Sequence, residues 1–190
     1  ADPTRVPTPA PFIGAALAAP APTASQRAGD WPNFGNDPGG SQYSPLRQIS
    51  TANVAGLKLA WVHRSGDVAA RGSAVGATAL ESVPIVVNET LYYCTALNRV
   101  FALDPATGAQ KWVFDPHVAT GGVAPLTAER RKSGICRGVA YWQAAVPRAG
   151  ATCEKRIFKA DIFGNVYAID ADTGASCRDF GAARGHPGLI

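Results

Sequence analysis

The sequence predicts an all-β fold built from repeated four-stranded antiparallel units, and two observations carry this prediction. First, the ten residues 100–109 return 66 residues later as residues 166–175, with six identical positions and two conservative exchanges. Second, each copy reads as a short apolar strand that enters an Asp-x-x-Thr-Gly turn, where Asp caps the turn and Gly supplies a positive φ. Units of this kind stack as the blades of a β-propeller, because one unit alone cannot bury its apolar face.

A lead-in, residues 1–29, precedes the repeats and is rich in Ala, Pro and Thr. It shows neither the period of a strand nor that of a helix, so we expect it to be flexible. The propeller portion is expected over residues 30–190. Its first strand, residues 57–63, has no inner strands before it, and such a strand often completes the last blade and closes the ring.

Two blades are predicted after this closing strand. Blade one covers residues 81–115, with strands at 83–87, 90–95, 99–103 and 110–114. Blade two covers residues 136–181, with strands at 139–143, 156–160 and 165–169 and a weaker fourth strand at 177–180. Because propellers have roughly 4–8 blades, most of a ring is expected to lie outside this sequence.

Charge and cysteine content narrow the class of protein. The net charge of +4 is mild and scattered, and no basic stripe interleaved with aromatics suggests a nucleic-acid surface. The three histidines are isolated, so no zinc-type cluster is visible. The four cysteines have no C-x-x-C spacing and are read either as two disulfides in an oxidising compartment or as four buried thiols.

Two further motifs resemble the pyrroloquinoline-quinone (PQQ) dependent dehydrogenases. The first resembles the N-terminal signature of that family, except that Ser50 stands where the family has Asn; it reads Asp30-Trp31-x3-Gly35-Asn36-x6-Tyr43-Ser44-x4-Ile49-x3-Asn53-Val54-x2-Leu57-Lys58. The second resembles the family's tryptophan-docking repeat and reads Ala102-x-Asp104-x2-Thr107-Gly108-x3-Trp112. The second copy of that repeat keeps residues 168–174 but has Arg178 where Trp is expected.

The resemblance is strongest to the membrane-bound glucose dehydrogenases and their polyol and quinate relatives. It implies an eight-bladed propeller in the periplasm that binds PQQ with Ca²⁺ or Mg²⁺, oxidises a sugar, polyol or cyclic alcohol, and passes electrons to ubiquinone. The catalytic base, the metal ligands and any inner-membrane anchor are expected outside this segment, with the base and the ligands beyond Ile190. Ser133 replaces a His that lies near the substrate in the glucose enzymes, which favours another substrate.

The resemblance implies that Glu81 and Arg137 are cofactor-binding residues, and each comes just before the inner strand of its blade. Arg137 suits the tricarboxylated PQQ by bidentate pairing, and Glu81 can accept hydrogen bonds. Without the resemblance, Glu81 would be read as a solvated loop residue and Arg137 as part of a basic loop. The alternative function is a non-enzymatic propeller scaffold that binds protein partners, of the outer-membrane assembly type.

The order of the strands favours one of the three possible disulfide pairings. Cys94 ends the second strand of blade one and Cys136 leads into the inner strand of blade two, so both belong at the funnel face. Cys153 and Cys177 belong at the opposite face. The predicted pairs are therefore Cys94–Cys136 and Cys153–Cys177, since strand length keeps cross-face pairs farther apart than a disulfide allows.

Overall fold

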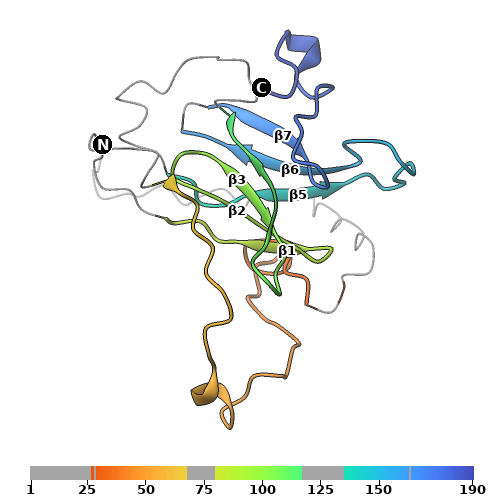
Figure 1. The fold of residues 1–190 in the computed structure, drawn as a ribbon. Coiled ribbons are helices and arrows are strands. Elements are labelled where there is room, and N and C mark those ends of the chain that lie inside the picture. The colour runs from red at the N-terminus through yellow and green to blue at the C-terminus, as the bar shows by residue number, and fades with distance from the viewer. Residues whose placement is uncertain (1–26, 28, 68–79, 117–134, 163) are drawn as a thin grey trace, which may run out of the picture.

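The computed structural model describes residue 27 and residues 29–67, 80–116, 135–162 and 164–190. Regular structure in these ranges is β-sheet, with two single-turn 3₁₀ helices, η1 (Val54–Gly56) and η3 (Ala182–Arg184) (Figure 1). The prediction of an all-β fold is confirmed. Most of the lead-in and Ser133 lie outside the described residues. None of the described helices is long and apolar enough to cross a membrane.

The first sheet contains the four antiparallel strands that the sequence predicts for blade one. In spatial order they are β1 (Ile85–Val87), β2 (Thr90–Cys94), β3 (Val100–Leu103) and β4 (Gln110–Phe114). Asn88 and Glu89 form the tight β1–β2 turn with φ of 50° and 57°, as two-residue hairpins require. In the β3–β4 turn, Asp104 Oδ1 accepts hydrogen bonds from the Ala106 and Thr107 N–H groups.

The second sheet contains three strands, β5 (Ala140–Gln143), β6 (Lys155–Ala160) and β7 (Val166–Asp170). The fourth strand predicted at residues 177–180 is wrong, because the chain turns there and the Phe180 N–H bonds to the Cys177 carbonyl at 3.0 Å. Two short pieces occupy the outer edge of β7 instead. Ser176 pairs with Ile169, and Leu189 pairs with Tyr167.

The fourth strand is thus interrupted by residues 178–187, which we call the insertion. In the first sheet Val113 lies opposite Phe101, and in the second sheet Leu189 holds the matching place opposite Tyr167. Gly188, whose carbonyl accepts from the Ala168 N–H, therefore stands where Trp112 stands in the first sheet. The expectation that Arg178 takes the Trp position is wrong. The 66-residue offset that aligns Arg178 with Trp112 does not hold beyond residue 177, because the insertion begins there.

The two sheets pack through Trp112. Its indole Nε1 donates to the Ala171 carbonyl at 3.0 Å, and a Cβ added to Gly174 would lie 2.8 Å from its Cδ2 atom. Tyr92 donates to the same carbonyl at 3.1 Å. Trp112 therefore docks on the turn at the end of β7.

Residues 61–63 contact the first sheet in the same way that residues 112–114 of β4 contact the second sheet. Trp61 Nε1 donates to the Pro105 carbonyl at 3.2 Å, and its ring covers Gly108. The His63 ring lies 5.0 Å from Phe101, and the Phe114 ring lies 5.8 Å from Tyr167, both edge-on. Residues 57–63 pair with no strand in the described ranges, so their ring-closing role stays a prediction that this repeated contact supports.

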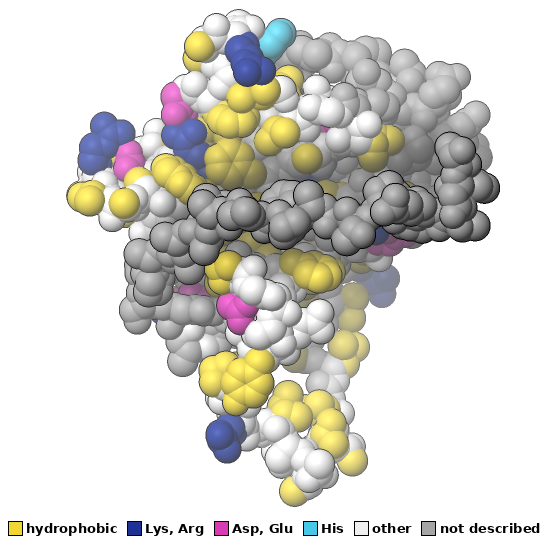
Figure 2. All heavy atoms as spheres, turned by 180° about the vertical axis from the view of Figure 1, so that it is seen from behind, with side chains coloured by type: hydrophobic (Ala, Val, Ile, Leu, Met, Phe, Trp, Pro, Cys, Tyr) yellow, Lys and Arg dark blue, Asp and Glu magenta, His cyan; other side chains and the backbone are white. Residues whose placement is uncertain are grey.

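An extended arm precedes these residues and projects away from both sheets (Figure 1, orange to yellow). It carries η1 and exposes large apolar side chains, such as Tyr43 at 63% and Ile49 at 62%. Hydrophobic side chains are visible in the lower part of Figure 2. At its beginning, Trp31 exchanges two backbone hydrogen bonds with Val86 on the free edge of β1.

Candidate functional site

The inner strands of the two sheets begin side by side. Val83 forms a parallel bridge with Gly138, and the Val83 N–H donates to the Arg137 carbonyl at 2.9 Å. Each inner strand is therefore entered from the same end of the blades. Glu81 and Arg137, which come just before these strands, lie together at that end, which we call the rim.

The structure brings the two candidate residues into an ion pair. Arg137 Nη2 lies 3.6 Å from Glu81 Oε2, and the side chains are 82% and 41% exposed. An exposed pair of this length adds little stability, because water screens both charges. Both groups therefore remain available to a ligand, the guanidinium for carboxylates and the carboxylate for hydrogen-bond donors.

A disulfide holds the rim together beneath this pair. Cys94 and Cys136 are bonded, with their Cα atoms 5.8 Å apart, and both are buried. This pairing, derived from strand order, ties the end of β2 to the residue before Arg137. Ser82, which sequence reasoning missed, adds a contact because its hydroxyl accepts from the Cys94 N–H at 3.2 Å.

The β2–β3 turn at the rim is held from two sides by charged groups that the sequence did not reveal. Asp67 accepts from the Leu97 N–H at 2.9 Å and also pairs with Arg99. From the second sheet, Lys159 Nζ donates to Asn98 Oδ1 at 2.5 Å. Lys159 is 1% exposed, and burial lowers its pKa to about 8. The sequence did offer one indication of this contact, because Lys159 shares the inward face of β6 with Ile157.

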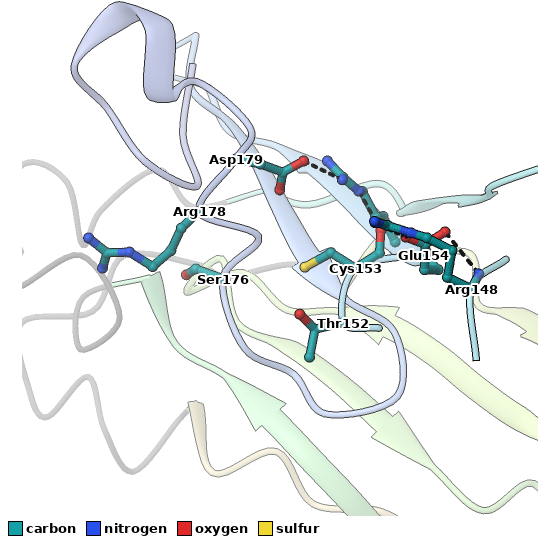
Figure 3. A pocket seen from close by; sticks show the side chains of 8 residues that line it. Arg148, Thr152, Cys153, Glu154, Ser176, Arg178 and Asp179 are labelled. Atoms are coloured by element: carbon teal, nitrogen blue, oxygen red, sulfur yellow. Dashed lines mark hydrogen bonds and ion pairs between the residues drawn. The ribbon is translucent and has the colours of Figure 1, made fainter. Parts of the chain in front are cut away.

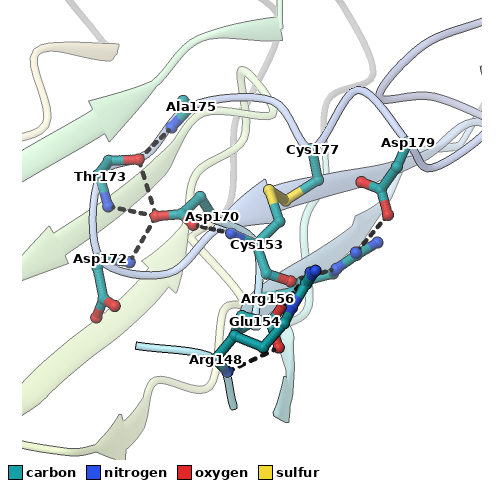
Figure 4. Close-up of a disulfide and its surroundings, with 10 residues drawn as sticks. All are labelled: Arg148, Cys153, Glu154, Arg156, Asp170, Asp172, Thr173, Ala175, Cys177 and Asp179. Carbon is teal, nitrogen blue, oxygen red and sulfur yellow. Dashed lines mark hydrogen bonds and ion pairs between the residues drawn. A yellow bond between two sulfur atoms is a disulfide. The ribbon is translucent and has the colours of Figure 1, made fainter. Parts of the chain in front are cut away.

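The second disulfide lies at the opposite end of the blades. Cys153 and Cys177 are bonded with their Cα atoms 5.7 Å apart, the other pair that strand order predicts (Figure 4). Burial acts to raise the pKa of Asp170 beside it, but hydrogen bonds from the Cys153 N–H and from Thr173 outweigh burial and lower it. Asp179 lies near both sulfurs, but a disulfide offers no thiolate, so this group does not suit a metal ion.

A groove of about 390 Å³ borders this disulfide (Figure 3). Two of its arginines are paired, Arg148 with Glu154 and Arg156 with Asp179, each at 2.5 Å. The Arg178 side chain points away from the groove in Figure 3. The groove therefore presents nearly balanced charge and lies far from the rim.

Comparison with known proteins identifies the family. Residues 31–186 match the PQQ family described as "Glucose/ethanol/alcohol dehydrogenase, beta-propeller domain". The chain belongs to this family. Its rim therefore lies on a PQQ dehydrogenase propeller, and the resemblance stated from the sequence motifs is confirmed.

The relatives are quinoprotein dehydrogenases of several kinds. The chain is 41% identical over 155 residues to the quinoprotein glucose dehydrogenase of Escherichia coli, covering 80% of this chain and 18% of that protein. It is 35% identical over 180 residues to the glycerol dehydrogenase large subunit of Gluconobacter thailandicus, covering 95% of this chain and 22% of that protein. The chain thus spans about a fifth of the length of these relatives.

A solved structure supports the fold. The quinohemoprotein alcohol dehydrogenase of Comamonas testosteroni superposes with a TM-score of 0.56 at 28% identity, over 81% of this chain and 19% of that one. The two sheets are therefore blades of a propeller. The donor set at the rim fits PQQ, since an exposed guanidinium and an exposed carboxylate face the same end of adjacent inner strands.

Proposed function

We propose that this chain is part of a longer PQQ-dependent dehydrogenase that oxidises a sugar, polyol or cyclic alcohol. Its family and its glucose and glycerol dehydrogenase relatives support this assignment. Ubiquinone is the proposed electron acceptor and the periplasm the proposed location. Two disulfides, which persist in oxidising compartments, are consistent with that location.

The observation that carries the proposal is the placement of Glu81 and Arg137 at neighbouring inner-strand starts. Arg137 would bind a PQQ carboxylate through paired N–H donors and direct further donors toward the quinone oxygens. Glu81 would accept a hydrogen bond and keep Arg137 oriented toward the funnel. The Cys94–Cys136 disulfide fixes the backbone next to both residues, which limits their movement relative to the cofactor.

PQQ, when bound, supplies the two-electron redox chemistry, and this segment supplies binding and orientation. The reaction also needs a base for the hydroxyl proton and a Ca²⁺ or Mg²⁺ ion to polarise the quinone carbonyl. We place these groups in the part of the enzyme beyond Ile190. The segment alone is therefore expected to be inactive.

The substrate is proposed as a class and not as a compound. Ser133, at the position of a histidine in the glucose enzymes, directs the proposal toward a polyol or cyclic alcohol.

The test is reconstitution of the full-length apoenzyme with PQQ and Ca²⁺ or Mg²⁺. We expect PQQ-dependent absorbance and reduction of an artificial dye with a panel that includes glucose, glycerol and a cyclic polyol. Absence of PQQ uptake under any metal condition would contradict the proposal and favour a protein-binding scaffold. Uptake of PQQ with activity on glucose alone would contradict only the preference for a polyol or cyclic alcohol drawn from Ser133.

A further inference from the structure

The face of the second sheet that points away from the first sheet carries an aromatic cluster. Ile157 and Lys159 point toward the first sheet, so Arg156 and Phe158, which alternate with them on β6, point the other way. Trp142 lies opposite Arg156 in the β5–β6 ladder and shares this face. The Trp142 side chain is 45% exposed, and the Arg156 guanidinium lies 5.4 Å from its ring centre.

The insertion folds over part of this face. The Phe180 ring lies 5.4 Å from Phe158, edge-on, and Asp179 pairs with Arg156 at 2.5 Å (Figure 4). The Gly188 N–H donates to the Phe180 carbonyl at 2.6 Å and closes the loop. Gly181 has φ of 72°, and a Cβ there would lie 1.9 Å from the Leu189 carbonyl oxygen, so the loop requires glycine at this position. Hydrophobic side chains gather below this C-terminal loop in Figure 2.

The corresponding face of the first sheet, which packs against the second sheet, carries a tryptophan where the second sheet has Phe180. Tyr92, which stands 66 residues before Phe158, lies 5.8 Å from Trp112, and both rings pack against the second sheet. In the second sheet, Gly188 holds the backbone position of Trp112 and brings no side chain. Phe180 supplies an aromatic ring to Phe158 as Trp112 supplies one to Tyr92.

We infer that Phe180 takes the place of the docking tryptophan, and that the face formed by Trp142, Arg156, Phe158 and Phe180 binds the sheet formed by the chain that follows Ile190. This rests on the proposal that the chain is part of a longer propeller. The occupant follows from continuity, because the same contact occurs twice upstream, at Trp61 and at Trp112. Phenylalanine has no N–H group, so this interface forms without the indole–carbonyl hydrogen bond of the other two.

The test is photo-crosslinking in the full-length protein, with p-benzoylphenylalanine in place of Phe180 and, as control, in place of Glu89. Glu89 is exposed in the β1–β2 turn of the first sheet, away from the aromatic face. We expect the label at position 180 to join peptides that follow Ile190, and the label at position 89 to give none of these products. Crosslinks from position 180 confined to residues 136–190, or to a second copy of the protein, would overturn the inference.

Thermal unfolding of three variants of the full-length protein gives a second readout. Phe180→Trp is expected to keep the melting temperature and Phe180→Ala to lower it, while Arg184→Ala at the exposed tip of the insertion leaves it unchanged. Equal melting temperatures for Phe180→Ala and Arg184→Ala would contradict the inference. Neither experiment depends on PQQ, so failure here is separate from failure of the proposed function.

Discussion

At the scale of single residues, Lys159 is the clearest case of a charge placed inside the molecule. Its ammonium group donates to Asn98 Oδ1 and lies 5.6 Å from the Tyr167 ring centre. Burial favours the neutral amine, while the charge of Asp161 opposes that shift. The Lys159–Asn98 hydrogen bond joins the two sheets near the rim, and the stability of the fold therefore depends on the charge of Lys159.

This arrangement predicts how stability changes with pH. Because folding lowers the pKa of Lys159 from 10.5 to about 8, the unfolded chain binds more protons between these pH values. Stability contributed by this residue therefore increases as pH rises through that window, by up to about 3 kcal/mol at about 1.4 kcal/mol per pKa unit. Chemical unfolding of wild type and Lys159→Met at pH 8 and pH 10.5 measures this contribution. The free energy of unfolding of wild type minus that of Lys159→Met should rise by this amount between the two pH values. The partly exposed Lys155→Met serves as control and should keep the wild-type slope.

At the scale of elements, local turn chemistry made the fold predictable and an insertion limited the prediction. The Asp-x-x-Thr-Gly turn needs only neighbouring residues, so the β3–β4 turn could be predicted from the sequence. The interrupted fourth strand could not be predicted, because the hydrogen bonds to β7 resume only at Gly188, after the ten residues of the insertion. Trp61 was missed as a docking residue because no complete hairpin precedes it.

The docking contact predicts a difference between two glycine substitutions. Gly174 and Gly164 both have positive φ, 78° and 83°, so alanine strains the backbone at each by about 1–2 kcal/mol. At Gly174 the new methyl group also meets the Trp112 ring, whereas nothing lies within 4 Å at Gly164. We expect Gly174→Ala to lower the free energy of unfolding by about 1–3 kcal/mol more than Gly164→Ala, measured in urea. Equal losses would show that Trp112 does not pack tightly on the turn.

At the scale of the whole molecule, strand direction explains why the rim residues meet. Consecutive inner strands run the same way, so residues that precede them gather at one end, and two disulfides follow at the two ends. The meeting of Glu81 with Arg137 and the pairing of the two disulfides both follow from strand order alone. Asp67 could not be predicted as a supporting group, because it acts across a long sequence separation with no local pattern. The inward position of Lys159 on β6 signals a buried contact, but its partner Asn98, 61 residues away, could not be predicted.

The central claim is that Arg137 binds PQQ at this rim, and the direct measurement is the dissociation constant of PQQ in the full-length apoenzyme. Arg137→Ala should weaken binding by about 1.5–3 kcal/mol, the value of a hydrogen bond to a charged group, which is a factor of about 10–150. Arg148→Ala, a similarly exposed arginine on the β5–β6 hairpin, should bind PQQ as wild type does. Equal affinity of Arg137→Ala and wild type would contradict the account.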